Sequence, residues 1–570
     1  MTRITDITKI RLHELATPEA VASASKVAFN DLEYAILQKV SRPLPSANNT
    51  YDPLTIAPFL ISCRKLVEEE LKRTSSGYSA FRWLWYLRRL PRFIFEGNLS
   101  TTYTYAACLA EVISGLNRVT SPASTFSEGS TSYVINYDLN DSVVRRVLKF
   151  CRGVRYLSQI HVLIRLAGKG AEFYFKSWAL PLCRLDSERE EAIKLYDNRV
   201  AKGGRPLNRV GTVVASETIN TDLSNLILIV HPLANPEWGP SVLGLQMGEH
   251  MNVEIYVSYL PQLLSLDELA RFHSDLGLFG MQLWLPEVGV LLLLLGLAPS
   301  LLVNLRAAFI TVPQYGYFVV DSEILKEIVN ERIDEASSMV RSVIGNVDLP
   351  SNADDFLSVL EGTSGSAWPL IAGSSIRREG KILCIDLYTA TIQLNDLLEF
   401  PRISGNPANV RADHFELTVQ GVIDSSQWCP SNELRKLRGL KIRHGGRVIT
   451  DLDGIGAHGD TLLIVSCKSL IYSAAYDIGD YAVVRNAATT IEKAVAHWSG
   501  IKKFLEANPK GDNYDFSGYR QLIAVVCTPD PVYLPLGPAT QFVAPGLMAV
   551  SSLFELSNWL HGPKGELGDN

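Results

Sequence analysis

Extended and helical patterns alternate in a fixed order through the last third of the chain. Two runs of apolar and β-branched residues flank the turn Ala457-His458-Gly459-Asp460, which is typical of a β-hairpin. Segments with apolar residues at helical spacing precede and follow this hairpin, and a later apolar run stops before two prolines, which cannot donate to a sheet. The predicted order is helix, strand, strand, helix and strand, at residues 410–423, 447–455, 461–467, 486–506 and 522–528.

The length of the chain requires more than this one unit. A single hydrophobic core rarely grows past ~250–300 residues, so 570 residues predict two or three domains. A stretch rich in Gly, Ser, Pro, Asn and Asp at residues 345–375 marks a boundary. We expect an α/β multidomain protein with a mainly helical region, a mixed α/β region, a linker and lead-in segment, a C-terminal α/β domain and a tail, at residues 1–120, 121–344, 345–400, 401–540 and 541–570.

The first two regions carry patterns of both kinds. Apolar residues at helical spacing dominate the N-terminus, and β-branched runs with a later amphipathic segment follow. We predict helices at 54–73, 78–95, 103–116 and 324–344, a polar loop at 120–132, and strands at 226–230 and 253–259.

Charge and cysteine usage limit the location and the partners. The net charge of −6 excludes a generally basic nucleic-acid coat, so any contact with nucleic acid must be local. The eight cysteines are scattered without a C-x-x-C pair, which is typical of a reducing compartment. The N-terminus lacks the apolar segment of a signal peptide, and the apolar stretch at 288–303 is shorter than the ~20 residues of a membrane helix. We expect a cytoplasmic protein without a membrane partner.

Polar side chains gather where the two hairpin strands end. Because residues i and i+2 of a strand share a face, Asp451 and Asp453 are expected on one side, and Ser466 and Lys468 likewise. Carboxylates and an ammonium group held at adjacent strand ends can bind a hard cation and a water beside a phosphate. On these residues alone, an ordinary surface hairpin with charged ends stays open as an alternative.

The segment DLDGIGAHGDTLLIVSCKS, residues 451–469, resembles the active-site hairpin of the PD-(D/E)XK (restriction endonuclease-like) nuclease superfamily. In that family a metal-binding Asp is followed on the next strand by (D/E)-x-K, and here Asp453 is followed by Ser466-Cys467-Lys468. Glu416 matches an acidic residue on the preceding helix, and IEKAVAHWSGIKKFL and LIAVVCTPDPVYLP resemble the following helix and closing strand. The resemblance implies a restriction-endonuclease-like α/β/α domain at 401–540, and the N-terminal region carries no such resemblance.

The resemblance also implies a role for each matching residue. Asp453 would bind Mg²⁺ (or Mn²⁺) through its carboxylate, and the backbone carbonyl of Cys467 would complete the coordination. Lys468 would position or deprotonate the attacking water and stabilise the charge that grows on the phosphate. Glu416 would bind a second metal ion or orient the first through water.

One position departs from the family pattern. Ser466 stands where the family has Asp or Glu, and a neutral hydroxyl is a poor ligand for Mg²⁺. In family members with Ser at this position, an acidic residue on the next helix supplies the carboxylate, and Glu492 is our candidate, ahead of Asp477 and Asp480. Asp451 is a further candidate ligand. The alternative is that the metal site is lost and the domain only binds.

A run of basic residues leads into the first hairpin strand. It contains no acidic residue, and clusters of this kind neutralise the phosphates of nucleic acid. A solvated basic loop is the alternative. The run consists of Arg435, Lys436, Arg438, Lys441, Arg443 and Arg447.

The expected function is that of a Mg²⁺-dependent endonuclease that hydrolyses phosphodiester bonds, with DNA as the favoured substrate. A non-catalytic nucleic-acid-binding or scaffold protein with a degenerate nuclease fold is the alternative. A third alternative places the main activity in the N-terminal region. Assembly as a homodimer is left open.

Overall fold

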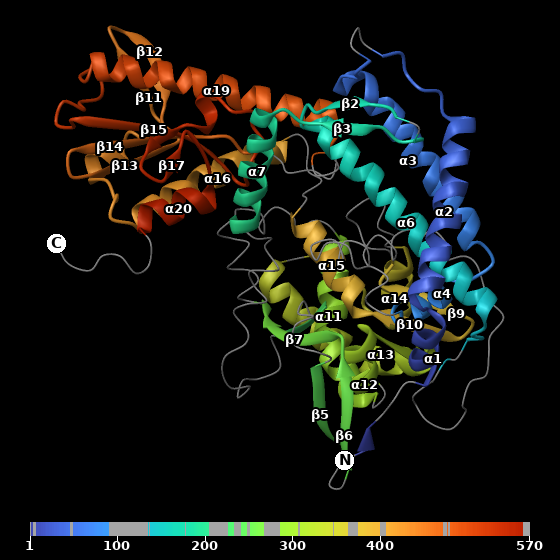
Figure 1. Ribbon diagram of the computed structural model, residues 1–570. Coiled ribbons are helices and arrows are strands. Elements are labelled where there is room, and N and C mark those ends of the chain that lie inside the picture. The colour runs from blue at the N-terminus through green and yellow to red at the C-terminus, as the bar shows by residue number, and fades with distance from the viewer. Residues whose placement is uncertain are drawn as a thin grey trace.

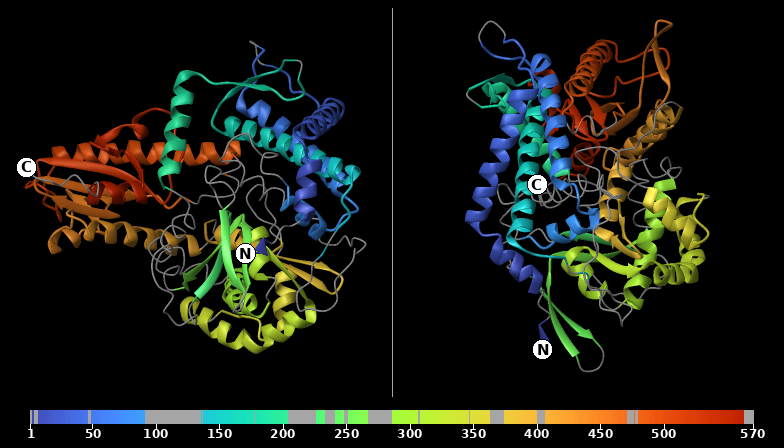
Figure 2. Two further views of the ribbon diagram at one scale, coloured as in Figure 1. Left: turned by 60° about the horizontal axis from the view of Figure 1, so that its bottom comes forward. Right: turned by 90° about the vertical axis from the view of Figure 1, so that its right-hand side faces the viewer.

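The computed structural model shows a mixed α/β protein with several small sheets and long helices (Figures 1 and 2). The N-terminal helices lie at one end of the molecule and the C-terminal sheet at the other (Figure 1). The residues that it describes are 2–3, 7–45, 49–90, 135, 137–176, 178–203, 226–232, 241–247, 251–266, 286–305, 308–345, 347–362, 374–399, 406–470, 476 and 479–562.

The N-terminal region is a helical bundle around a core rich in aromatic residues, among them Trp83, Trp85 and Phe150. The helices predicted at 54–73 and 78–95 correspond to α3 and to the shorter α4, whereas the segments at 103–116 and 120–132 lie outside the described residues. α2 and α3 pack along α6, as Figure 2 shows. The described elements are α1 (Ile7–Leu15), α2 (Pro18–Lys39), α3 (Pro53–Ser75), α4 (Ala80–Leu87), α6 (Asp141–Gly168), β2 (Glu172–Tyr174) and β3 (Leu182–Arg184).

The central part of the chain forms a second hydrophobic core. β10 pairs with β8 in antiparallel register, so the segment 345–400, expected as a linker and lead-in, contributes strands and helices to this core. The predicted helix at 324–344 is α13, and the predicted strand at 226–230 is β4. The elements are β4 (Leu226–Pro232), β5 (Ser241–Met247), β6 (Met251–Val257), β7 (Tyr259–Ser265), α11 (Pro286–Asn304), α12 (Ala308–Tyr315), β8 (Tyr317–Asp321), α13 (Ser322–Ile344), α14 (Ala353–Gly362), β9 (Ile376–Glu379), β10 (Ile382–Asp386) and α15 (Leu387–Glu399), with β1 (Thr2–Arg3) paired to β6.

The predicted strand at 253–259 is divided in the structure. Ser258 separates β6 from β7, and these two strands belong to different sheets. β-branched and apolar residues continue through this point, so the sequence pattern does not mark the change of partner.

α11 is the most apolar helix of this core. Among the described residues it alone is long and apolar enough to cross a membrane, and 61% of its Glu287–Asn304 window is buried within the protein. It packs against α13, α15 and β4. Burial on several sides explains why its sequence is apolar around its whole circumference.

The C-terminal domain is built on a four-stranded mixed sheet in the order β13-β14-β15-β18. β13 and β14 are antiparallel, whereas β15 and β18 run parallel to β14. Side chains alternate between the two faces, so that Leu462 and Ile464 pack under α19, and Leu463 and Val465 pack under α16 and α20 (Figure 1). The elements are α16 (Asn406–Asp424), α17 (Asn432–Arg435), β11 (Lys441–His444), β12 (Arg447–Asp451), β13 (Gly454–His458), β14 (Thr461–Cys467), α19 (Tyr481–Ala507), β15 (Gln521–Thr528), η4 (Pro538–Thr540), β16 (Phe542–Ala544), β17 (Leu547–Met548), β18 (Val550–Ser552) and α20 (Leu553–His561).

The single strand predicted at 447–455 is two strands in two sheets. β12 ends at Asp451 and pairs with β11, whereas β13 begins at Gly454 and pairs with β14. Two glycines let α16 lie close on β13, because a Cβ at Gly456 would come within 2.7 Å of Ile423 and 2.9 Å of the Trp428 carbonyl. The prediction that Asp451 and Asp453 share a face because they lie on one strand is therefore wrong: Asp451 ends β12, and Asp453 lies between the two strands.

The segment 541–570, expected as a tail, contains β18, which completes the sheet, and α20, which covers one face of it. α20 begins at a capping box between Ser552 and Glu555. Its structured part extends the domain to residue 562.

A helix from the middle of the chain also belongs to this domain. α7 (Ser187–Gly203) places Ala192, Ile193 and Tyr196 in the core under α19. The buried Arg199 forms a two-pronged ion pair with Glu555 of α20, with Nε–Oε1 and Nη2–Oε2 distances of 2.7 and 2.8 Å. Bidentate pairs of this kind fix the geometry of both partners.

Candidate active site

Asp453 lies in the break between β12 and β13. Its Oδ2 accepts a hydrogen bond of 2.7 Å from the backbone N–H of Cys467 and one of 3.4 Å from the Ser466 hydroxyl. Because Gly454 pairs with Val465, Asp453 stands opposite Ser466 where the two antiparallel strands end. Burial raises the pKa of the Asp453 carboxyl, although the Cys467 N–H and the Lys468 ammonium act to lower it.

Lys468 follows β14 directly and is held at the same end of the sheet. Its backbone N–H donates to the carbonyl of Cys527 on β15, at 2.8 Å. Its side chain is half-buried, and its charge acts on the carboxyl of Asp453. The sheet thus brings a carboxylate and an ammonium group together at neighbouring strand ends.

Glu416 approaches the same place from α16. Burial, and next the Asp453 carboxylate, raise the pKa of Glu416 to about 7, although Arg438 acts to lower it. Asp451, the exposed last residue of β12, also raises the pKa values of Glu416 and Asp453. The negative charges of Asp453 and Asp451 thus disfavour ionisation of Glu416, and that of Asp451 disfavours ionisation of Asp453.

The helix that carries Glu416 is joined to the sheet by Gln420, a residue that no sequence motif marks. Gln420, one turn further along α16, is buried, and its amide spans the backbone of Ile455 on the edge strand β13. Its Oε1 accepts from the Ile455 N–H at 2.9 Å, and its Nε2 donates to the Ile455 carbonyl at 3.0 Å. In the sequence, Gln420 is marked only as a polar residue next to the apolar positions 415, 419 and 423 of the same helix.

Cys467 contacts the site through its backbone N–H, which donates to Asp453. Its thiol is buried among apolar residues beneath α16 and α20, and burial raises the pKa of this thiol well above its ordinary value. A protonated, enclosed thiol is a poor ligand for a hard cation. Coordination by the Cys467 carbonyl stays a prediction.

The carboxylate expected from the helix after the hairpin stays a prediction. Glu492 is exposed on α19, and the charges that act most on the pKa of Asp453 are Lys468 and Asp451. Asp480 caps the start of α19, where its side chain accepts from the Val483 N–H at 3.0 Å. Asp477 lies outside the described residues. Asp451 acts on the pKa values of both Asp453 and Glu416, so it is an additional candidate carboxylate beside Glu492.

The basic run divides into two parts. Arg435 forms an ion pair with Asp424 at 2.8 Å, and Nε of Arg438 donates to the Asp453 carbonyl at 3.2 Å. Both side chains are therefore engaged within the domain, and Arg438 contacts the site through the Asp453 carbonyl. The side chains that are exposed to solvent are those of Lys436, Lys441, Arg443 and Arg447.

The donor atoms at this site suit a hard cation that is shared with substrate. In the part of the chain that the structure describes, no three His, Cys, Asp or Glu side chains are grouped so that they could hold a metal ion by themselves. Mg²⁺ is usually bound through one or two carboxylates together with water and substrate phosphates. Asp453 and Glu416 supply two carboxylates whose repulsion a divalent cation would relieve. The residues thus fit Mg²⁺ or Mn²⁺ held jointly with a phosphate.

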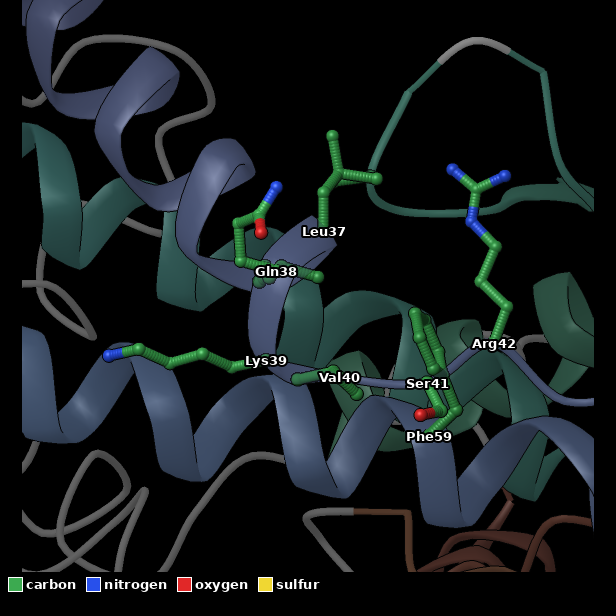
Figure 3. A pocket seen from close by; sticks show the side chains of 9 residues that line it. Leu37, Gln38, Lys39, Val40, Ser41, Arg42 and Phe59 are labelled. Atoms are coloured by element: carbon green, nitrogen blue, oxygen red, sulfur yellow. The ribbon is translucent and has the colours of Figure 1, made fainter.

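A separate hollow of about 240 Å³ lies at the end of α2 (Figure 3), a helix on the other side of the molecule from the C-terminal sheet (Figure 1). Leu37, Val40 and Phe59 form its apolar part, and Lys39 and Arg42 extend from its rim (Figure 3). Its lining contains no carboxylate, so it does not suit a divalent cation.

No family model, curated protein or solved structure matches this chain.

Proposed function

We propose that the protein is a metal-dependent nuclease of the PD-(D/E)XK type that hydrolyses phosphodiester bonds in DNA. The observation that carries the proposal is the convergence of Asp453, Lys468 and Glu416 at one end of a mixed sheet. The restriction-endonuclease-like α/β/α fold, with α19 on one face and α16 and α20 on the other, belongs to the same proposal.

Each residue has a chemical role in this scheme. Asp453 and Glu416 would hold Mg²⁺ or Mn²⁺, and the ion would lower the pKa of a bound water and polarise the phosphate. Lys468 positions the attacking water and stabilises the negative charge that develops on the phosphate. Gln420 holds Glu416 in place through the backbone of Ile455.

The test is incubation of the purified full chain with plasmid, single-stranded DNA and RNA in the presence of Mg²⁺ or Mn²⁺. We expect cleavage that EDTA stops and that the Asp453→Asn variant, purified in parallel, lacks. Cleavage retained by Asp453→Asn would assign the activity to another site or to a contaminant.

A second candidate function is nucleic-acid binding without catalysis. The observation that favours it is Ser466, whose hydroxyl donates to Asp453 where the family has a carboxylate. Under this alternative the wild-type protein binds DNA and never cleaves it, and Ser466→Glu confers metal-dependent cleavage. Activity of the wild-type chain excludes it.

A further inference from the structure

The β11–β12 hairpin stands outside the main sheet of the C-terminal domain, at the end of the molecule opposite to α2 and α3 (Figure 1). A two-stranded hairpin alone is marginally stable in water. Its inner face is anchored, because Ile442 is fully buried and the ring of His444 packs edge-on against Phe504. Its outer face, which includes Lys441 and Arg443, is exposed.

The loop before β15 closes the outer edge of β11. The Asn513 side chain acts as an additional peptide group: its Oδ1 accepts from the Arg443 N–H at 2.8 Å, and its Nδ2 donates to the Lys441 carbonyl at 3.1 Å. The backbone N–H of Asp512 donates to the Arg443 carbonyl at 2.8 Å. The edge groups of Lys441 and Arg443 are therefore satisfied without a further strand.

The tip of the hairpin is held by the same loop. Gly445 and Gly446 both have positive φ, and their N–H groups donate to the two carboxylate oxygens of Asp512 at 3.0 and 2.7 Å. Because the hairpin backbone is fixed at its edge and tip, Lys441 and Arg443 start from ordered backbone positions. Less conformational entropy is then lost when these side chains bind a partner.

The outer face leads directly to the candidate active site. Lys441 is the register partner of Asp451, and Arg443 is the partner of Val448, so these four side chains share the outward face. Lys441 and Arg443 lie two residues apart, or ~7 Å along a strand. The two positive side chains of this face, Lys441 and Arg443, therefore form a line that ends beside Asp451. The Asp451 carboxylate in turn acts on the pKa of Asp453.

We propose that this hairpin binds the sugar-phosphate backbone of duplex DNA and guides it to Asp453 and Lys468, an inference that rests on the function proposed above. Lys441 and Arg443 neutralise the phosphates beside the one that is cleaved.

Duplex DNA is favoured over a single strand as the partner. A single strand binds by stacking its bases on aromatic rings, and the outward residues of the hairpin include none: they are Lys441, Arg443, Val448 and Asp451. The B-form major groove admits a two-stranded β-ribbon, whereas the major groove of an RNA helix is too deep and narrow. Contacts to phosphate predict binding without strong sequence preference.

The test measures binding of the full chain to a labelled DNA duplex, a single strand of the same sequence and an RNA duplex, by fluorescence anisotropy in EDTA across a salt series. Lys441→Ala/Arg443→Ala should weaken duplex binding by roughly tenfold and reduce the slope of log K against log salt by about 2, since each phosphate contact contributes about 0.9. The charge-retaining variant Lys441→Arg/Arg443→Lys should keep the slope. The matched control Lys26→Ala/Lys72→Ala removes two exposed charges at the far end of the molecule and should change neither.

The outcomes separate this inference from the proposed function. An unchanged slope in Lys441→Ala/Arg443→Ala, or equal binding of the single strand, would overturn the hairpin assignment even if the wild-type chain cleaves DNA. Duplex binding that depends on Lys441 and Arg443 in a chain that never cleaves would sustain the hairpin assignment and reject the nuclease. A wild-type chain that binds no duplex would overturn the assignment outright.

Discussion

The backbone N–H of Cys467 donates a 2.7 Å hydrogen bond to Oδ2 of Asp453, and this bond joins the ends of β13 and β14. The Ser466 hydroxyl also donates to Oδ2. Both bonds end on one oxygen, so Oδ1 is the atom from which we expect a cation to be bound. The hydrogen bond thus orients the carboxylate for its proposed role.

Asp453→Asn should abolish cleavage and weaken binding of Mn²⁺, because it removes the negative charge while keeping the size of the side chain. Isothermal titration with Mn²⁺ and a plasmid-cleavage assay measure the two effects. The matched control is Asp460→Asn in the hairpin turn, where the carboxylate is exposed. Full Mn²⁺ affinity in Asp453→Asn would remove this residue from the metal site.

Lys468→Ala should lower the cleavage rate by roughly 10²–10⁴, the range for a lost acid–base group, while metal affinity is largely retained. Single-turnover cleavage and Mn²⁺ titration separate chemistry from metal binding. Lys493→Ala, an exposed lysine of α19, is the control. A rate within a factor of two of wild type would show that Lys468 does not act on the reacting groups.

The pKa of Glu416, raised to about 7, predicts pH-dependent metal binding. Below that pH the carboxyl holds a proton that the cation must displace, so the apparent Mg²⁺ affinity should rise with pH and level off above about 7. In the metal-free protein the folded state binds this proton more tightly than the unfolded state, so the stabilisation it gives is lost as the pH rises from 4.5 through about 7.

Glu416→Gln should flatten both pH profiles, which calorimetric titration of Mg²⁺ and thermal unfolding without metal would measure. A profile that keeps its shape in Glu416→Gln would assign the titrating proton to another group, such as Asp453.

Gln420→Leu should destabilise the protein by about 1–3 kcal/mol, because the buried N–H and carbonyl of Ile455 lose their hydrogen-bond partners. It should also lower cleavage, since α16 then no longer holds Glu416 against Asp453. Chemical denaturation and the cleavage assay measure the two effects. Gln427→Leu, at an exposed position shortly after the same helix, should leave both unchanged.

Gly511→Ala should loosen the β11–β12 hairpin, because the added Cβ would lie 2.4 Å from the Arg443 carbonyl oxygen and 2.1 Å from the Tyr514 ring. Overpacking of this kind costs about 1–3 kcal/mol. Hydrogen exchange should accelerate at the amides of Arg443 and Gly446, which the Asp512–Asn513 loop protects. Gly518→Ala, where a Cβ meets open space, is the control, and equal protection in both variants would contradict the proposed role of the loop.

The order of elements in the last third could be read from the sequence because the patterns there are long and regular. The apolar face of α19 and the continuous run of β14 specify a helix and a strand by periodicity alone. The break at Asp453 could not be read, since β-strand character continues across it and only the pairing partner changes. β18 has three residues, too few to show a pattern, and its place in the sheet follows from its pairing with β15.

The candidate site was predictable in part for the same reason. Asp453 and Lys468 stand at the ends of strands that the pattern identifies, so their proximity follows from the hairpin. Gln420 and Arg438 act through backbone groups of residues distant in sequence, which no local pattern encodes.

The ion pair between Arg199 and Glu555 joins residues 356 positions apart, and this separation has a consequence for synthesis. Chains are made at about 5–20 residues per second, so α7 leaves the ribosome on the order of tens of seconds before α20 exists. During that interval the C-terminal core does not yet exist, so it cannot cover the side chains of Ala192, Ile193 and Tyr196. Completion of this domain thus depends on a helix made much earlier, and a chain that ended near residue 540 would lack β18 and α20, which complete its sheet and cover one face.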